Sequence, residues 1–283
     1  DLSARKDQHA ALQSWLLEQS AKVFNLNEEH LFQAALVKVS HNQHLLFLTG
    51  HHIVSDGPSM GTIIGELMSL YDAAKTGEQA KLSTPKQYRD FVQWLASERS
   101  NTKMLKHEHY WKKQFSNPPA NLELPIDHPR PELKSYQGAR LRHTLQNSTL
   151  QALKTLASKQ GCTLYMLLMA AYTAYIHRLS SQERLVVGTP YTGRGMEGAQ
   201  SLVGYCVHLL PILSEIDDTT SFQHHLQHIR TTLLDAYTHQ DYPFARLIDQ
   251  LSLKRDISRS PLISTIFNLE RLPTPQRVAD ITV

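Results

Sequence analysis

The sequence predicts a layered α/β or α+β fold arranged in two lobes. Segments with apolar residues at helical spacing alternate with short apolar segments that are typical of strands. The chain has 283 residues, which is enough for about two domains of ~150 residues each. A proline-rich segment over residues 118–131 is typical of an extended linker. We therefore expect a first lobe over residues 1–117, this linker, and a second lobe over residues 132–283.

The first lobe is expected to begin with a helix, two strands and a second helix. Apolar spacing predicts a helix over residues 10–24, and apolar-polar alternation predicts a strand over residues 31–39. Residues 44–52 contain a continuous apolar run, which is typical of a strand covered on both faces. Pro58 suits the start of a helix and predicts an amphipathic helix over residues 59–74. Two further helices are expected over residues 86–97 and 104–115.

The second lobe is expected to alternate strands and helices in the same way. Its most apolar stretch, residues 165–176, is shorter than the ~20 residues of a membrane helix. We therefore expect a buried helix over residues 163–179. The other expected elements are strands over residues 137–145, 184–188, 203–212 and 263–269, and helices over residues 149–159 and 222–237 and before Gln250.

Composition excludes several classes of function. The 29 Lys and Arg against 26 Asp and Glu leave a net charge of +3, and the basic residues are scattered, which argues against nucleic-acid binding. Cys162 and Cys206 are the only cysteines, too few for a disulfide framework or a structural zinc site. This cysteine usage fits a reducing, cytoplasmic setting, and we expect no contact with a membrane.

The most informative motif is His-His-x-x-x-Asp-Gly, formed by His51, His52, Asp56 and Gly57. A strand carries the histidine pair to a turn, where a side chain can point into a cleft. A histidine there can accept a proton from an amine or hydroxyl nucleophile, or orient it, for roughly 10²- to 10⁴-fold in rate. Asp56 is expected to cap the following helix or to pair with an arginine.

The motif has two alternative interpretations. The histidines would simply be polar residues that finish a strand, or they would bind a metal ion. Adjacent histidines on a strand point to opposite faces, so His51 and His52 make a poor chelating pair. We therefore expect no metal site.

Four further segments carry a family resemblance together with this motif. Residues 88–94 resemble a Tyr-x-Asp-aromatic-Ala-x-Trp segment, with Val92 in place of Ala. The others are residues 187–194 with 202–211, residues 239–244 with 247–248, and residues 255–262 leading to Phe267 and Asn268. In this order they resemble the condensation domains of nonribosomal peptide synthetases. The chain departs from the family pattern at Gly193 and His208, where Asn is usual.

The resemblance implies a two-lobed chloramphenicol acetyltransferase-like fold, of which this chain would be an internal fragment truncated at both ends. It implies amide-bond formation between a donor acyl or peptidyl thioester and an acceptor aminoacyl thioester. No cofactor would be bound directly, because both substrates are presented on phosphopantetheine arms of donor and acceptor carrier proteins. An adjacent adenylation domain is a further expected partner, and antibiotic or other secondary-metabolite biosynthesis is the expected setting.

The resemblance also assigns roles to residues. His52 would be catalytic, in a tunnel between the lobes, either as a base or as a group that positions the amine. His51 and Asp56 would be structural, and Arg194 is a candidate partner of Asp56. Gly57 would let a backbone N–H approach the thioester oxygen at the start of a helix. The alternatives are an epimerisation domain of the same fold and a noncatalytic recruitment domain.

Overall fold

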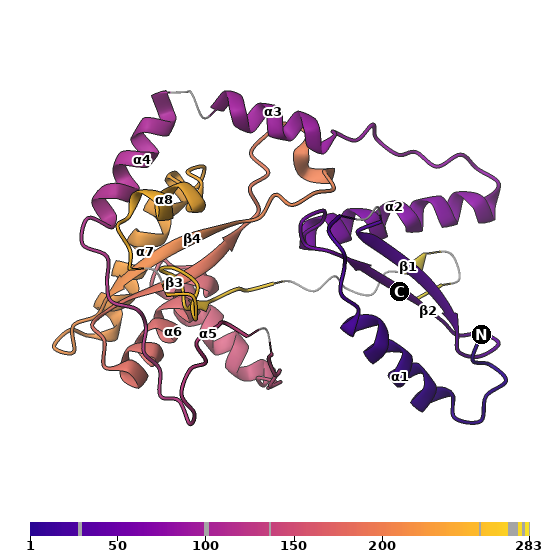
Figure 1. Cartoon of the computed structure of the whole chain (residues 1–283), viewed down its shortest axis with the longest axis horizontal. Coiled ribbons are helices and arrows are strands. Elements are labelled where there is room, and N and C mark those ends of the chain that lie inside the picture. The colour runs from indigo at the N-terminus through magenta and orange to yellow at the C-terminus, as the bar shows by residue number, and fades with distance from the viewer. Residues whose placement is uncertain are drawn as a thin grey trace. The chain divides into compact units, whose positions relative to one another are not determined.

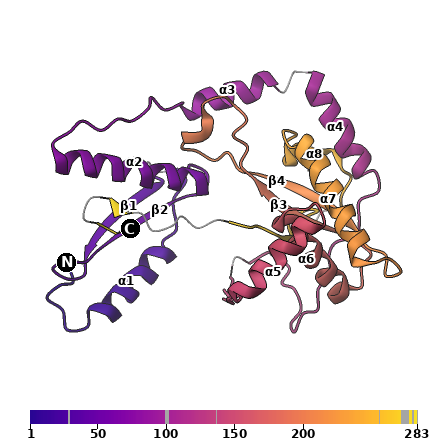
Figure 2. The same cartoon turned by 180° about the vertical axis from the view of Figure 1, so that it is seen from behind.

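The computed structural model describes residues 1–27, 30–98, 102–135, 137–254, 256–270, 277–278 and 281–282 (Figures 1 and 2). The chain divides into two compact units. Unit 1 contains Asp1–Gln93, Met196–Cys206 and Arg277–Val283, and unit 2 contains Trp94–Gly195 and Val207–Gln276. A segment from late in the sequence therefore belongs to the unit that contains the His-His-x-x-x-Asp-Gly motif.

Unit 1 is built on a β-hairpin and two helices (Figure 1). The first helix is α1 (Gln8–Ala21), and β1 (Phe32–Lys38) pairs antiparallel with β2 (His44–Gly50). Next comes α2 (Gly57–Thr76), with Asp56 as its N-cap and Gly77 in the left-handed conformation at its C-terminus, at φ 75°. These elements confirm the predicted helix, two strands and helix. The remaining elements of unit 1 are the start of α3 (Tyr88–Glu98), a 3₁₀ turn at Ala199–Ser201, and the two-residue strands β6 (Arg277–Val278) and β7 (Ile281–Thr282).

Unit 2 is a three-stranded sheet with helices packed against it. The strand order is β4-β3-β5, with β3 antiparallel to β4 and parallel to β5. Helix α6 packs against α5, α7 and β3, and α7 also packs against β4. The strands are β3 (Arg184–Tyr191), β4 (His208–Glu215) and β5 (Thr265–Ile266), and the helices are α4 (Thr102–Gln114), α5 (Asn147–Lys159), α6 (Leu164–Ser180), α7 (Phe222–Thr238) and α8 (Phe244–Gln250).

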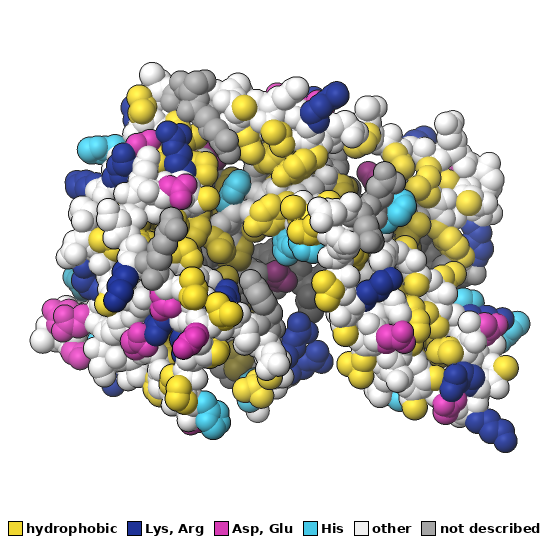
Figure 3. Space-filling view, in the orientation of Figure 1, with side chains coloured by type: hydrophobic (Ala, Val, Ile, Leu, Met, Phe, Trp, Pro, Cys, Tyr) yellow, Lys and Arg dark blue, Asp and Glu magenta, His cyan; other side chains and the backbone are white. Residues whose placement is uncertain are grey.

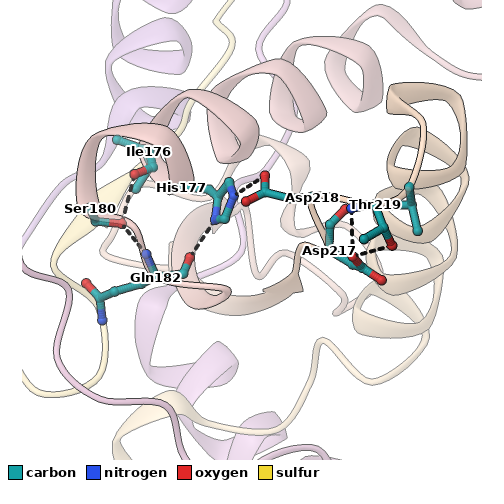
Figure 4. Close-up of polar contacts among 8 residues, drawn as sticks. Ile176, His177, Ser180, Gln182, Asp217, Asp218 and Thr219 are labelled. Carbon is teal, nitrogen blue, oxygen red and sulfur yellow. Dashed lines mark hydrogen bonds and ion pairs between the residues drawn. The ribbon is translucent and has the colours of Figure 1, made fainter.

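The main hydrophobic cluster lies within unit 2. Met169, Ile212, Ile229 and Leu233 are among its fully buried members, contributed by α6, β4 and α7. The end of α6 is held by polar contacts, in which His177 Nδ1 contacts the Gln182 carbonyl at 2.9 Å and Nε2 contacts Asp218 Oδ1 at 3.0 Å (Figure 4). Apolar packing therefore forms the interior of unit 2, and the polar contacts of His177 lie at the end of α6.

Three expectations for individual elements are wrong. Residues 137–145 carry no strand, and Leu141 is 87% exposed. The strand predicted over residues 203–212 begins only at His208. The strand β2 is not covered on both faces, because β1 and β2 form a two-stranded sheet in which every residue except Val37 of β1 is half-buried or exposed.

The two compact units have boundaries at different residues from those of the predicted lobes. The change from unit 1 to unit 2 falls after Gln93, because Trp111 of α4 and Phe115, which follows α4, pack into the cluster of unit 2. Leu122, inside the proline-rich segment, is buried in the same cluster. Lobe boundaries at residues 117 and 132 remain a prediction.

Two surface properties bear on function. In the space-filling view, Lys and Arg side chains are dispersed rather than gathered in one large patch (Figure 3). Among the described helices, none is long and apolar enough to cross a membrane.

Candidate active site

The histidine pair lies on a tight turn between β2 and α2. The N–H of Val54 donates to the carbonyl of His51 at 3.0 Å, which closes the turn immediately after the strand. The His51 ring accepts a hydrogen bond at Nδ1 from the N–H of Ile53 at 3.1 Å and contacts Phe24 edge-on. His52 is exposed, and its ring packs edge-on against Tyr205 at a centroid distance of 5.2 Å. The two rings therefore have different neighbours, and His52 is the accessible one.

Asp56 fixes the residues that follow this turn through a set of buried hydrogen bonds. Its Oδ1 accepts from the N–H of Ser59 at 3.0 Å and from the Ser59 hydroxyl at 2.6 Å. Its Oδ2 accepts from the N–H of Cys206 at 3.0 Å. Ser59 Oγ in turn accepts from the N–H of Gly204 at 3.0 Å. Asp56 is 3% exposed and Ser59 is fully buried, so this group, which we call the Asp56 clamp, joins the start of α2 to residues 204–206.

Tyr88 fixes the same late segment from its other side. Its hydroxyl donates to the carbonyl of Tyr205 at 2.9 Å. Its ring covers Gly204 so closely that a Cβ at Gly204 would lie 2.2 Å from a ring carbon. Burial, followed by the nearby Cys206 and Asp56, raises the pKa of Tyr88, which keeps its hydroxyl as a hydrogen-bond donor. Tyr205 is thus held in place where its ring contacts His52.

Gly57 is the first residue of α2 and is exposed. A Cβ built at this position would meet nothing within 4 Å, and its backbone is not in the left-handed region. More distant parts of the fold therefore leave room for a side chain here, whereas Pro58, the next residue, disfavours helical backbone at a residue with a Cβ. A backbone N–H at a helix N-terminus carries part of the positive end of the helix dipole, which favours a negatively charged group nearby.

The structure brings together four of the five predicted site residues. His51, His52, Asp56 and Gly57 lie in unit 1, whereas Arg194 lies in unit 2. Arg194 Nη1 donates to the carbonyl of Thr192 at 3.3 Å. The pairing of Arg194 with Asp56 therefore remains a prediction.

Unit 2 contains a cavity beside the loop of Arg194. Gly193, whose φ of 63° is favourable for glycine, lines this cavity of about 280 Å³ together with His208. The two positions at which the sequence departs from the expected Asn residues thus line one cavity. Burial, followed by the charge of His239, lowers the pKa of His107, another lining residue. Other residues on its wall include Trp94, Met104, Asp241 and Pro243.

Sequence reasoning missed Ser59, Gly204 and Tyr205. Asp56 and Ser59 occupy the N-cap position and the third helical position, a spacing at which side chains satisfy the free N–H groups of a helix start. That spacing would have identified Ser59. Gly204 and Tyr205 lie within residues 202–211, a segment that carries the family resemblance, but no role in the site followed from it. Within the described part of the chain, no three His, Cys, Asp or Glu side chains lie close enough together to hold a metal ion.

Comparison with known proteins decides the family. The family model described as Condensation domain matches residues 1–282. The chain belongs to the condensation domain family. The prediction made from the motifs is therefore confirmed.

Relatives of this condensation domain are nonribosomal peptide synthetases. Bacitracin synthase 1 of Bacillus licheniformis is 37% identical over 243 residues, which are 86% of this chain and 4% of that protein. Tyrocidine synthase 3 of Brevibacillus parabrevis is 34% identical over 283 residues, which are 100% of this chain and 4% of that protein. The condensation domain thus spans only a small part of the length of these relatives.

A solved structure supports the predicted fold. The first condensation domain of the CDA synthetase matches with a TM-score of 0.78 at 21% identity, over 100% of this chain and 62% of that one. The chloramphenicol acetyltransferase-like fold expected from the motifs is therefore confirmed.

Proposed function

We propose that this condensation domain forms an amide bond between two thioester-bound substrates. The donor is an acyl or peptidyl thioester and the acceptor is an aminoacyl thioester, each carried on the phosphopantetheine arm of a carrier protein, with an adenylation domain as neighbour. Family membership supports the reaction class. The observation that carries the assignment to residues is the exposed His52 ring on a turn anchored by the buried Asp56 clamp.

The reaction needs few chemical groups from the protein. The lone pair of the acceptor α-amine attacks the donor carbonyl carbon, so a C–N bond forms and negative charge develops on the carbonyl oxygen. The C–S bond then breaks, and the donor arm leaves as a thiol. The nitrogen loses one proton, and the thiolate gains one, so atoms and charge balance. His52 acts at the nitrogen, either by accepting its proton or by orienting the amine toward the carbonyl.

The neighbouring groups support this role in different ways. The N–H of Gly57 lies at the positive end of α2, where it would stabilise the developing charge on the thioester oxygen. Asp56 does not act on substrate in this proposal. It positions His52, because it fixes the start of α2 and the segment that carries Tyr205.

The test places the chain between a loaded donor and a loaded acceptor carrier protein and measures carrier-bound products by mass spectrometry. We expect His52→Ala to lower the condensation rate by roughly 10²-fold or more with an unchanged circular dichroism spectrum. His44→Ala is the matched control, because His44 is also an exposed histidine of unit 1, and we expect full activity. Equal product yield from His52→Ala would remove His52 from the mechanism.

Two further readouts sharpen the test. If His52 is a base, His52→Gln should be as inactive as His52→Ala, whereas partial activity of His52→Gln would indicate positioning by hydrogen bonding. Inversion of the acceptor aminoacyl centre without amide formation would contradict the proposal in favour of epimerisation. Carrier binding without any product would contradict it in favour of recruitment.

A further inference from the structure

The ring of His52 is held by an aromatic contact and not by a hydrogen bond. Its neighbour is Tyr205, at a centroid distance of 5.2 Å and an interplanar angle of 88°, which is a favoured edge-to-face geometry for an aromatic pair. Within the described part of the chain, no side chain or backbone group hydrogen-bonds to the His52 ring. A catalytic histidine is commonly oriented by a third group, such as a carboxylate bound to its second nitrogen. Tyr205 is in position to restrict the His52 ring instead.

This restriction matters because His52 is exposed. An exposed side chain exchanges among several staggered rotamers, whereas the proposed reaction needs a direction that presents a ring nitrogen to the amine. An aromatic pair favours one direction over the others by about two- to twelvefold. The Tyr205 ring is uncharged and makes no hydrogen bond with the imidazole, so both nitrogens of His52 remain available to the amine.

The backbone of Tyr205 is fixed on both sides by the Asp56 clamp. The N–H of Gly204 donates to Ser59 Oγ, and the N–H of Cys206 donates to Asp56 Oδ2, each at 3.0 Å. These three successive residues belong to no helix or strand. Tertiary hydrogen bonds therefore define the path of the chain at Tyr205, where regular secondary structure does not.

Tyr88 adds a third hydrogen bond, to Tyr205 itself. Its hydroxyl donates to the carbonyl of Tyr205 at 2.9 Å, and its ring covers Gly204. The Tyr205 side chain gains little burial from this arrangement, since the residue is 45% exposed. The three hydrogen bonds instead fix the direction in which its ring points, which is toward His52.

We infer that Tyr205 is a positioning residue for His52 and that Tyr88 acts through Tyr205. The inference rests on the proposed function, because it requires His52 to act on the amine. The ring of Tyr205 makes the contact, so phenylalanine at this position should preserve it. Leucine is apolar but has no ring and should lose it.

The kinetic test uses the full chain with loaded donor and acceptor carrier proteins and measures kcat and KM for amide formation. We expect Tyr205→Leu to lower kcat about fivefold, within the range of an aromatic pair, with KM unchanged. Tyr205→Phe should keep the wild-type kcat. Tyr71→Leu is the matched control, because Tyr71 is also a partly exposed tyrosine of unit 1, and it should change neither constant.

A double-mutant cycle tests whether Tyr205 acts through His52. In the His52→Ala background, Tyr205→Leu should cause no further loss, because no imidazole is left to orient. The same fivefold loss in that background would overturn the inference, and so would an unchanged kcat of Tyr205→Leu in the wild-type background. A raised KM with unchanged kcat would also overturn it, by placing Tyr205 against the substrate.

Tyr88→Phe provides a second variant that leaves the Tyr205 ring in the chain. It removes the hydroxyl that binds the carbonyl of Tyr205. We expect a smaller loss of kcat than in Tyr205→Leu, and no further loss when Tyr88→Phe is combined with Tyr205→Leu. Equal losses in both backgrounds would show that Tyr88 does not act through Tyr205.

A spectroscopic readout separates this inference from the proposed function. In the chain with isotopically labelled histidine, the ring resonance that disappears in His52→Ala belongs to His52. The ring current of Tyr205 should shift this resonance, so it should move in Tyr205→Leu and stay in place in Tyr205→Phe. This measurement needs no substrate. Failure of the proposed function would abolish amide formation by the wild type, whereas failure of this inference alone would leave an active wild type and a Tyr205→Leu variant with the same kcat and the same His52 resonance.

Discussion

The two units of the molecule are stabilised in different ways. In unit 2, side chains of α6, α7, β3 and β4 form the main hydrophobic cluster. In unit 1, helix α1 buries no residue and β1 buries only Val37. The buried residues next to the histidine turn are polar, namely Ser55, Asp56 and Ser59. Unit 1 also buries the apolar side chains of Phe91, Ala199, Leu202 and Cys206. Directed hydrogen bonds therefore act together with a small apolar cluster at the place where the proposed chemistry occurs.

This difference bears on the proposed role of the histidine turn in unit 1. Hydrogen bonds from Ser59 and Cys206 set the direction of one carboxylate, and through it the start of α2. Apolar packing buries area but has weak directional preference. A polar clamp therefore orients His52, while the packed cluster of unit 2 provides stability. The Asp56 clamp is sensitive to mutation, because the loss of one buried hydrogen-bonding partner leaves other polar groups unsatisfied.

The largest expected effect is that of Asp56→Ala. The change removes the N-cap of α2 and leaves the buried N–H of Cys206 without this acceptor. We expect unit 1 to lose about 3–4 kcal/mol of stability, the sum of a lost cap and an unsatisfied buried donor. Condensation activity should fall with it. Peptide-level hydrogen exchange measures the change, with faster exchange in residues 51–76 and 204–206 and unchanged exchange in α6 and α7.

Asp7→Ala is the matched control for this prediction. Asp7 occupies the N-cap position of α1, but its side chain makes no capping hydrogen bond and instead pairs with exposed Arg5. Its removal should leave exchange unchanged in both units. Uniform exchange changes over both units in Asp56→Ala, or none at all, would contradict the contrast between them.

The stability of unit 2 should instead depend on a buried histidine that must stay neutral in the folded state. His225 is 5% exposed and its Nε2 contacts Thr173 Oγ1 at 2.8 Å. Burial, with the charges of His228, His177 and His224, lowers its pKa to about 4. The unfolded chain therefore binds a proton at higher pH than the folded chain does. Stability should fall as pH drops from about 6.5 to about 4, by about 3 kcal/mol in full, as measured by urea unfolding.

The pH dependence has an internal comparison. His225→Leu should flatten the stability profile in this window, whereas His224→Leu, at the adjacent exposed position, should keep it. His177 acts in a different window, since hydrogen bonds to Gln182 and Asp218 raise its pKa (Figure 4). Its contribution is present below about 6.5 and is lost as pH rises through the folded value. An identical profile in His225→Leu and wild type would refute the assignment.

The sequence predicted elements well where the signal is local. The bounds of α2, α5, α6 and α7 agree with prediction to within a few residues, because spacing and caps such as Asp56 and Thr163 act within one helix. A strand, by contrast, forms only when a second strand pairs with it, and a local pattern does not show that pairing. Leu141 and Leu145 alternate like strand residues but remain exposed. Residues 203–207 are apolar, yet the clamp holds Gly204 and Cys206, so β4 starts after them.

The residues of the candidate site also divide into those that a local motif identifies and those that only the folded chain brings close. His52, Asp56 and Gly57 stand in one motif and were found from it. Their partners Gly204, Tyr205 and Cys206 lie about 150 residues further along the chain. The contact between His52 and Tyr205 results from the Asp56 clamp and from Tyr88. No local pattern encodes such a contact, because it depends on which distant segment returns to the helix start.

The smallest expected effect on stability is that of Gly57→Ala, and it separates folding from chemistry within unit 1. Alanine at Gly57 meets open space beyond its chain neighbours, which favours the variant, whereas Pro58 disfavours helical backbone at a preceding residue with a Cβ. The two effects oppose each other, so stability should change by less than about 1 kcal/mol. Gly204→Ala is the contrast. Its Cβ would lie 2.2 Å from the Tyr88 ring, so we expect a loss of about 1–3 kcal/mol from overpacking. Thermal unfolding of both variants checks these values.

The activities of Gly57→Ala and Gly204→Ala should not follow their stabilities. If a thioester oxygen approaches the N–H of Gly57, a methyl group there obstructs it, and Gly57→Ala should condense substrates slowly while remaining fully folded. Gly204→Ala should lose activity only in proportion to its unfolding, with recovery at lower temperature. Full activity of Gly57→Ala would show that the oxygen does not approach this residue. The developing charge would then have to be stabilised by a group outside the helix start, and His52 alone would remain as the contribution of the turn.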